Sequence, residues 1–166
     1  PHRLTGHRLV KMDLPHADTS PIRLAPPVAP LVPLVFASPH SGTTYTRAFL
    51  DAARLDAHAL RRSEDSFVDD LFAAAPRHGA PLLAATFPRA WCDPNRARWE
   101  LDPAMFEDHL PPFVASDTPR ITAGLGTIAR VVASGEPIYR RKLRFAEAVA
   151  RIEACWDPYH AALEEL

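Results

Sequence analysis

The sequence predicts an α/β fold, because two short apolar runs flank a helical pattern between residues 31 and 87. The first run covers residues 31–37, and within it Leu34, Val35 and Phe36 are expected to form a buried strand bounded by prolines. The second run, residues 81–87, is a further strand candidate. Strand, helix and strand in this order are typical of a βαβ unit, whose two strands lie parallel in one sheet.

Composition excludes several classes of partner. The 166 residues suffice for one domain with a buried core, and 19 Lys and Arg against 20 Asp and Glu give a formal net charge of -1. No overall field therefore favours nucleic acid or an anionic membrane. The sequence shows no apolar run of membrane-spanning length and no signal-peptide core. Cys92 and Cys155 lack a paired spacing, which is typical of a reducing compartment, so we expect a cytoplasmic protein.

The first 62 residues contribute one expected strand. Prolines among polar residues interrupt residues 1–30, which show no helical or strand period and predict an extended leader. The domain is therefore expected to cover residues 31–166. Residues 46–62 carry several charges and only a weak apolar stripe, so we expect a loop and a short helix over the sheet edge.

The helix between the strands is expected to begin at Ser63 and to end at Gly79. Ser63 can cap its start, and Glu64 and Asp65 suit the positive end of the helix dipole. Glycine favours the left-handed conformation that closes many helices. Apolar residues at three- and four-residue steps predict a face turned toward the core: Phe67, Val68, Leu71, Phe72 and Ala75.

Three further segments follow the second strand. Residues 88–119 read as a long loop whose aromatic residues argue against disorder, and residues 121–132 as a helix weakened by two glycines. The late helix, residues 145–163, is the clearest, with Pro158 expected to kink it. Its apolar stripe consists of Phe145, Val149, Ile152, Trp156, Tyr159 and Leu163, and the charged residues expected off the stripe are Arg144, Glu147, Arg151 and Glu153.

Two groups of polar residues are placed to carry out chemistry beyond the strand ends. His40 follows the first strand, where open α/β sheets bind ligands, although a histidine in such a turn is also a common turn residue. A hydrolytic zinc site needs three protein ligands and an open position for water. His40 with Glu64 or Asp65 would supply two, and the alternative for both acids is helix-start acidity.

The second group follows the second strand and contains Arg89, Asp93, Asn95 and Arg96. The two guanidinium groups suit a carboxylate or a developing oxyanion. The alternative is that Asp93 pairs with one arginine in a structural turn. Because both strands are expected to open onto the same sheet edge, the combination favours a functional site.

Five segments occur in this order: SPHSGTTY (38–45), SEDSFVDDL (63–71), FPRAWCDPNR (87–96), EPIYRRKL (136–143) and CWDPYHAAL (155–163). Together they resemble the N-formylglutamate amidohydrolase family, which looks like a relative of the zinc carboxypeptidases and of the aspartoacylase and succinylglutamate desuccinylase group. The resemblance covers residues 31–166 and implies a three-layer α/β/α fold of the zinc-exopeptidase type, with a mostly parallel or mixed central sheet.

The resemblance also implies roles for single residues. His40 matches a zinc ligand and Asp65 a second one, with Glu64 ranked lower because it is the less regular position of that pair. Asn95 and Arg96 match the pair that grips the substrate's carboxylate in the wider group. Arg89 also matches and would polarise the scissile carbonyl, and Asp93 would orient these groups. Tyr139 and Arg140 match a pair counted as substrate-binding. Tyr159 and His160 match as well, with core packing expected for Tyr159.

One motif of the family is not found in the sequence. In the family a later strand ends in an Asp-x-His-Ser type motif that supplies another zinc ligand, and the catalytic carboxylate also lies downstream. His58, His78 and His109 are not placed to replace that ligand. We therefore expect the chain to be incomplete at its C-terminus.

The resemblance implies a zinc-dependent hydrolase that cleaves an N-acylated acidic amino acid such as N-formyl-L-glutamate, giving formate and glutamate, as in histidine degradation. One alternative is a non-catalytic protein that binds small carboxylates and lacks a complete metal site. Another is a carboxypeptidase-like peptidase. The sequence leaves the acyl group, the amino acid and the oligomeric state open.

Overall fold

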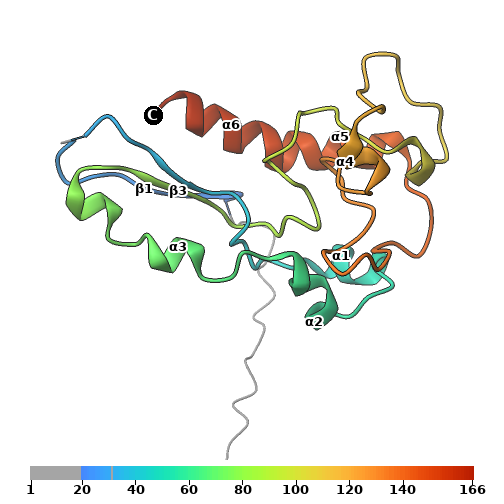
Figure 1. The fold of residues 1–166 in the computed structure, drawn as a ribbon, viewed down its shortest axis with the longest axis horizontal. Helices are drawn as coiled ribbons and strands as arrows, with labels where there is room; N and C mark the ends of the chain where they lie inside the picture. Colours follow the sequence, from blue (N-terminus) through green and yellow to red (C-terminus); the bar gives the residue numbers. More distant parts are fainter. Residues whose placement is uncertain (1–19, 31) are drawn as a thin grey trace, which may run out of the picture.

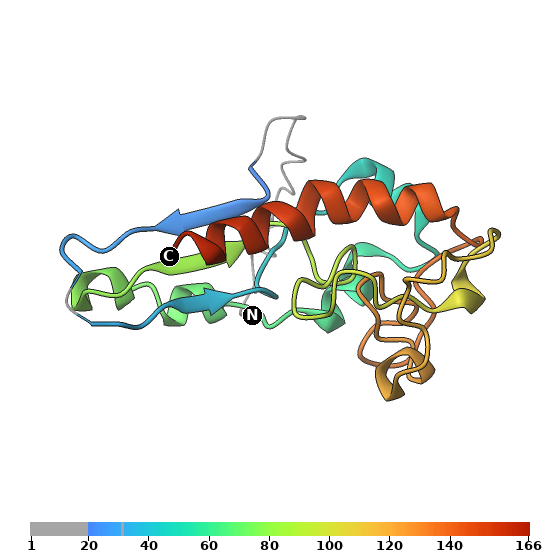
Figure 2. The same cartoon turned by 90° about the horizontal axis from the view of Figure 1, so that it is seen from above.

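A three-stranded mixed sheet forms one half of the molecule in the computed structural model, which describes residues 20–30 and 32–166. The strands are β1 (Ile22–Ala25), β2 (Phe36–Ser38) and β3 (Leu82–Ala85), in the order β1-β3-β2 (Figure 2). β2 runs parallel to β3, as expected for the βαβ unit, and β1 runs antiparallel to it. All four residues of β3 are buried, as expected for the central strand. The predicted α/β class with a mixed sheet is confirmed.

β1 lies inside the segment that was predicted to be an extended leader without a strand. It pairs Ile22 with Ala85 and Ala25 with Leu82, and the N–H of Thr86 continues the pairing to the carbonyl of Pro21 at 3.0 Å. The strand has only four residues and no run of β-branched residues, so the sequence pattern did not reveal it. Residues 1–19 of the predicted leader lie outside the described residues.

The first predicted strand begins later than expected. β2 starts at Phe36, while Leu34 and Val35 are 58% and 40% exposed, so the prediction of a buried strand at these two residues is wrong. Leu31 lies outside the described residues. β2 forms one edge of the described sheet, which explains why side chains beside it face solvent.

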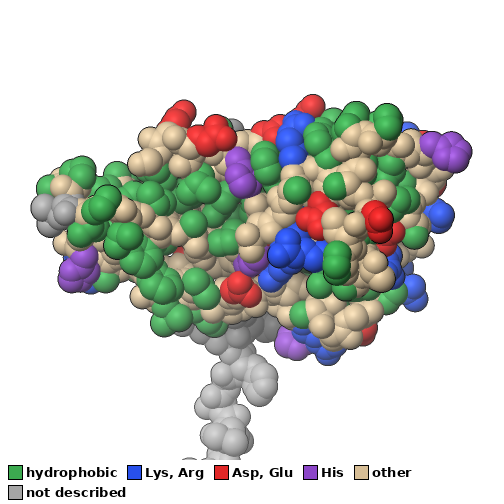
Figure 3. Space-filling model, turned by 45° about the horizontal axis from the view of Figure 1, so that its top comes forward, with side chains coloured by type: hydrophobic (Ala, Val, Ile, Leu, Met, Phe, Trp, Pro, Cys, Tyr) green, Lys and Arg blue, Asp and Glu red, His purple; other side chains and the backbone are tan. Residues whose placement is uncertain are grey.

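The prediction of a single core-facing helix over residues 63–79 is also wrong. The segment contains α3 (Val68–Leu71) and a separate 3₁₀ turn (Ala75–His78), and Phe67 before α3 has a left-handed backbone with φ 66°. Phe67 and Leu71 are 67% and 76% exposed. Gly79 does end the segment with φ 85°, as predicted. Figure 3 shows apolar side chains spread over the half of the molecule that contains the sheet, with many of the charged side chains toward the other half.

Short helices replace the longer ones expected elsewhere. Residues 46–62 form α1 (Arg47–Ala52), α2 (Ala57–Leu60) and a 3₁₀ turn (Arg61–Ser63). The helix predicted for residues 121–132 is a single turn, α4 (Pro119–Thr122), because Gly124 turns the chain away with φ 79°. The long loop 88–119 contains one 3₁₀ turn, Pro103–Met105.

The late helix forms as predicted. It consists of α5 (Phe145–Arg151), a π-helical turn (Ile152–Trp156) and α6 (Asp157–Glu164). The wide turn immediately precedes Pro158, whose missing N–H prevents a regular helical hydrogen bond at this point. Tyr159 is 3% exposed, so its expected core position is confirmed.

Arg151 departs from the predicted pattern of the late helix, because it is only 4% exposed. Its guanidinium group lies 3.6 Å from the centre of the Trp91 ring and donates a hydrogen bond of 2.7 Å to the hydroxyl of Tyr139. Stacking on an aromatic ring compensates part of the lost hydration of a buried cation. The sequence period alone did not predict this arrangement.

Two apolar clusters meet at the loop that follows β3. One lies between the sheet and the late helix and includes Leu83 and Tyr159, and the other surrounds α1 and includes Phe49 and Ile138. Trp91 packs against both. In Figure 1, α6 lies on one side of the sheet and α3 on the other, whereas the full zinc-exopeptidase arrangement stays a prediction. Among the described helices, none is long and apolar enough to cross a membrane.

Candidate active site

His40 lies just beyond the carboxyl end of β2, in a turn that packs tightly against the end of β3. A Cβ atom at Gly42 would come within 2.1 Å of the carbonyl oxygen of Phe87, so only glycine allows this approach. The hydroxyl groups of Ser38 and Ser41 lie 2.8 Å apart and join the two sides of the turn. The turn therefore places the His40 ring beside the loop that follows β3.

The imidazole of His40 lies between two carboxylates. Its Nε2 lies 2.7 Å from Oδ1 of Asp93, and its Nδ1 lies 3.1 Å from Oδ2 of Asp65. His40 and Asp93 are buried, while the Asp65 side chain is 52% exposed. Two of the predicted groups thus meet at one residue, as the expected sheet edge implied.

This geometry determines what each ring nitrogen does. An ionised carboxylate only accepts hydrogen bonds, so Nε2 of His40 carries a proton and donates a hydrogen bond to Asp93. In the neutral ring Nδ1 then presents a lone pair to the Asp65 carboxylate, which is also an acceptor. A proton or a metal cation between Nδ1 and Asp65 would convert this repulsive contact into an attractive one.

Asp93 is held from several sides. Its Oδ1 also accepts the backbone N–H of Asn95 at 2.9 Å, and its Oδ2 accepts the guanidinium of Arg89 at 3.0 Å. Burial by itself raises the pKa of Asp93, but the hydrogen bond and charge of His40, followed by Arg89 and the Asn95 N–H, hold that pKa below its ordinary value. Asp93 is therefore a fixed anion that orients His40.

The two adjacent acids of the SED segment face different partners. The backbone N–H of Asp65 donates to the carbonyl of His40 at 3.1 Å, which directs its carboxylate toward the ring. The Glu64 side chain is 1% exposed and accepts hydrogen bonds from Tyr45, Arg61 and Ser66. Burial and the hydrogen bond from the Tyr45 hydroxyl to Glu64 together raise the pKa of Tyr45. The structure therefore brings Asp65, and not Glu64, to His40.

Ser63 does not cap a helix, contrary to the sequence-based expectation. It ends the 3₁₀ turn after α2, and its hydroxyl accepts the backbone N–H of Ala133 at 3.1 Å. Residues 64–66 then run without regular structure to α3, so the expectation that Glu64 and Asp65 occupy the first turn of a helix is wrong. Their acidity is consequently not a helix-start feature.

Arg89, Asn95 and Arg96 surround Asp93 on the loop after β3. Nε of Arg96 lies 3.8 Å from Asp93 and donates to the carbonyl of Leu125 at 2.9 Å. Its Nη1 donates to the carbonyl of Asn95 at 2.8 Å. Asn95 is exposed, and the hydrogen bonds of the described residues engage its backbone and not its side chain. The alternative in which Asp93 pairs with an arginine holds for Arg89, and the carboxylate additionally binds His40.

A cavity of about 270 Å³ adjoins this network. Arg89 and Asp93 form its polar side, and small or aliphatic residues form most of the remainder. A cavity just below the usual size range for drug-like ligands suits a small molecule. Its other lining residues are Ser63, Ala90, Leu125, Ala129, Val131 and Ala133.

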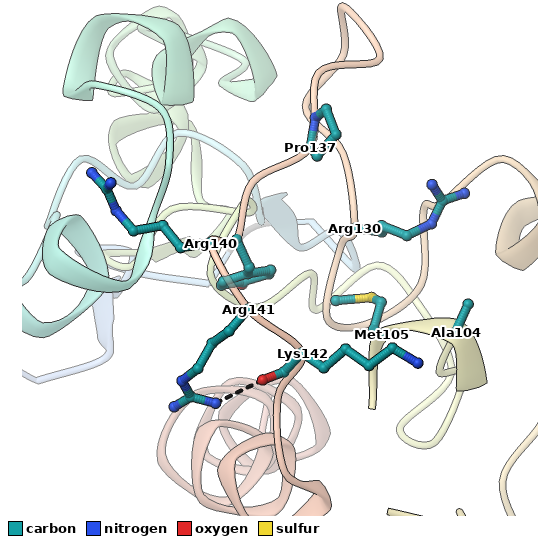
Figure 4. Close-up of a pocket in the computed structure, with 8 residues that line it drawn as sticks. Ala104, Met105, Arg130, Pro137, Arg140, Arg141 and Lys142 are labelled. Carbon is teal, nitrogen blue, oxygen red and sulfur yellow. Dashed lines mark hydrogen bonds between the residues drawn. The ribbon is translucent and has the colours of Figure 1, made fainter. Parts of the chain in front are cut away.

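Tyr139 and Arg140 line a different cavity, of about 240 Å³, which shares no lining residue with the first. Figure 4 shows the Arg140 side chain extending away from Arg130 and Lys142. Nε of Arg140 donates to the carbonyl of Ala53 at 2.7 Å. Burial raises the pKa of Tyr139 despite the nearby Arg151 charge. The structure thus does not bring this pair together with His40, and their substrate-binding role stays a prediction.

The described residues contain no group of three His, Cys, Asp or Glu side chains arranged to hold a metal ion. His40 and Asp65, two of the predicted ligands, lie 3.1 Å apart. The contact between His40 and Asp93 was not predicted from the residues, although the placement of both after neighbouring parallel strands was a usable signal. Trp156, Asp157 and His160 contact the same loop, and these contacts were not predicted, although His160 was named as a match to the family and Trp156 as part of the apolar stripe.

The chain is similar to known proteins in both sequence and structure. The sequence model of the family described as N-formylglutamate amidohydrolase matches residues 32–166. A crystal structure of N-formylglutamate amidohydrolase from Ralstonia eutropha JMP134 is similar, with 45% sequence identity and a TM-score of 0.81 over 89% of this chain. The chain spans about half, 51%, of that protein's length, and no curated protein matches it. The predicted resemblance is confirmed, and the chain belongs to the N-formylglutamate amidohydrolase family.

Proposed function

We propose that this chain carries part of the active site of a zinc-dependent amidohydrolase that converts N-formyl-L-glutamate into formate and glutamate. Family membership supports an amidohydrolase that acts on a small molecule. The observation that carries the proposal is the position of His40, whose Nε2 is held by buried Asp93 and whose Nδ1 faces the half-exposed carboxylate of Asp65.

His40 and Asp65 fit two positions of a zinc site. Histidine ligands of zinc commonly donate their second N–H to a carboxylate, which fixes the tautomer and the direction of the ring, and Asp93 is placed for that task. When bound, zinc would polarise the formyl carbonyl and make a water molecule easier to deprotonate. A third ligand is not supplied by the described residues.

Arg89 is placed to stabilise negative charge on the substrate. Its side chain is 23% exposed, lines the 270 Å³ cavity and lies between Asp93 at 3.0 Å and Asp65 at 3.8 Å. These contacts hold the guanidinium group in position before substrate binds. A fixed cation beside the carbonyl oxygen lowers the energy of the oxyanion that forms when water attacks the carbonyl.

Arg96 and Asn95 would hold a carboxylate of the substrate. Arginine has five N–H donors, and Arg96 uses two of them on the carbonyls of Leu125 and Asn95. The remaining donors can take a carboxylate in a paired hydrogen bond, and the Asn95 amide can add a neutral donor. Preference for an acidic amino acid would follow from these contacts.

The alternative function is a non-catalytic protein that binds small carboxylates. One observation favours it. Among residues 20–30 and 32–166, apart from Asp93, only His40 and Asp65 are ligand-type side chains that meet at this point.

A cytoplasmic location is part of the proposed amidohydrolase function, because Cys92 and Cys155 are free and buried thiols that suit a reducing compartment.

Release of formate from N-formyl-L-glutamate tests the proposal. We expect release that depends on added zinc, stops with a chelator and falls sharply in Arg89→Ala. N-Formyl-L-glutamine is the matched control substrate, because it differs from N-formyl-L-glutamate in lacking the side-chain carboxylate. Binding of formylglutamate without formate release, at any zinc concentration, would favour the carboxylate-binding protein instead.

A further inference from the structure

The late helix contacts the carbonyl groups on both sides of Asn95. Nε1 of Trp156 donates to the carbonyl of Arg96 at 3.0 Å. Nε2 of His160 lies 2.8 Å from the carbonyl of Pro94, and because a carbonyl only accepts, this nitrogen carries a proton. One helix thus fixes the backbone immediately before and after a residue assigned to substrate binding.

A third contact closes the same stretch of loop. Arg98 donates through Nε and Nη2 to the two carboxylate oxygens of Asp157, both at 2.7 Å. Paired hydrogen bonds of this kind fix orientation as well as distance. The rings of Trp156 and His160 also stack with their centres 3.7 Å apart, so these two side chains support each other.

The π-helical turn accounts for the placement of these residues. A π turn contains about one residue more than an α-helical turn, so it rotates every later side chain by about 100° around the helix axis. Trp156 ends this turn, and Asp157 and His160 begin α6. The same helix therefore presents Tyr159 to the core and these polar groups to the loop.

We propose that Trp156, Asp157 and His160 form a clamp that holds residues 94–98 so that Asn95 and Arg96 meet the carboxylate of the substrate. A separate contact, between Asp93 and the Asn95 N–H, holds the same stretch of loop. The three residues are positioning residues, since none of them lines the cavity beside Arg89. The role in substrate recognition rests on the proposed function.

Three variants separate the contacts. Trp156→Phe keeps a stacked ring and removes the N–H donor. Asp157→Asn keeps the shape and removes the charge that pairs with Arg98. His160→Leu removes the donor to Pro94, whereas His160→Gln keeps an N–H at a similar distance and should restore part of the effect. The control is Glu147→Gln, which breaks the Arg141 pair at the other end of the helix.

The first measurement is hydrogen exchange of the Asn95 amide, followed by NMR in the wild-type chain and each variant. We expect Trp156→Phe, Asp157→Asn and His160→Leu to speed exchange at Asn95 by about fivefold or more, the change that loss of one ordinary hydrogen bond produces. Exchange in β3 should stay unchanged, and the Glu147→Gln control should resemble wild type. Unchanged exchange at Asn95 in all three variants would overturn the clamp, whatever the enzyme activity.

The second measurement is the KM for N-formyl-L-glutamate and the dissociation constant of glutamate. Both should rise about fivefold while kcat changes less than twofold, and the effect should be absent with N-formyl-L-glutamine. A lower kcat with unchanged KM would contradict the role in carboxylate recognition. If wild type neither binds glutamate nor hydrolyses formylglutamate, the proposed function fails, and exchange at Asn95 still decides whether the clamp orders the loop.

Discussion

The two segments that bring carboxylates to His40 differ in how firmly they are held. The segment with Asp93 is buried, and its carboxylate accepts hydrogen bonds from His40, Arg89 and Asn95. The segment with Asp65 leaves its carboxylate half exposed, with His40 Nδ1 at 3.1 Å and Arg89 at 3.8 Å. A buried carboxylate that accepts several hydrogen bonds orients its neighbours, whereas a half-exposed carboxylate is able to bind an added cation. The difference supports our proposal that Asp93 positions His40 and that Asp65 binds the metal.

The largest expected effect is the loss of stability in Asp93→Ala. Removing this carboxylate leaves the buried N–H of His40 and the Arg89 guanidinium without their partner, so we expect destabilisation by about 3 kcal/mol. Asp65→Ala should cost less than about 0.5 kcal/mol, as for most exposed positions. Urea unfolding of both variants checks the comparison, and equal losses would abolish the distinction between the two acids.

A similar separation is expected between Asp65 and its neighbour. Glu64→Gln should cost about 1–3 kcal/mol, because the buried carboxylate accepts hydrogen bonds from three residues. Asp65→Asn should leave stability nearly unchanged and weaken zinc binding more than Glu64→Gln does. Calorimetric zinc titration together with thermal unfolding measures both properties, and the reverse ranking for zinc would identify Glu64 as the ligand.

Arg96→Lys tests whether the loop with Asp93 also binds substrate. Lysine keeps the charge but lacks the planar pair of donors, so the upward shift of the melting temperature caused by glutamate should be smaller than in wild type. Asp93→Asn is the comparison variant, since it should lower the melting temperature even without ligand. Equal glutamate shifts in wild type and Arg96→Lys would remove Arg96 from the substrate site.

The smallest expected effect concerns the pH dependence of the pair that Arg98 of the same loop forms with Asp157. The hydrogen bond from Arg98 holds the pKa of Asp157 below its ordinary value of 3.8. Its contribution to stability is therefore present above about pH 4 and is lost as the pH falls through the lowered pKa. The free energy of unfolding of wild type should exceed that of Asp157→Asn by less than about 1 kcal/mol at pH 7, since the pair is partly exposed. That excess should vanish near pH 2, and an excess that grows on acidification would contradict the assignment.

Local patterns in the sequence predicted part of this architecture. The apolar run before His40 and the run at residues 81–87 predicted parallel neighbours and a shared edge, because strand pairing follows from chain order and burial. The late helix followed from its apolar period, as the burial of Ile152 and Tyr159 confirms. The motif of the family placed Asp65 and Asp93 among the site residues before any geometry was known.

Other features depend on contacts between distant residues and had no local signal. The spacing of Phe67, Leu71 and Phe72 predicted a helix, but it does not encode the left-handed backbone of Phe67 that breaks it. Burial of Arg151 depends on Trp91 and Tyr139, which come from two other loops. The contact between His40 and Asp93 joins residues 53 positions apart.

We propose that His40 presents Nδ1 to a metal while Asp93 keeps Nε2 protonated. ¹⁵N NMR of the His40 imidazole during zinc titration tests it most directly. We expect a large change at Nδ1, no change in the protonation of Nε2, and loss of the Nδ1 response in Asp65→Asn. An unchanged His40 spectrum at saturating zinc, or a response at Nε2 instead of Nδ1, would show that His40 does not bind the metal in this way.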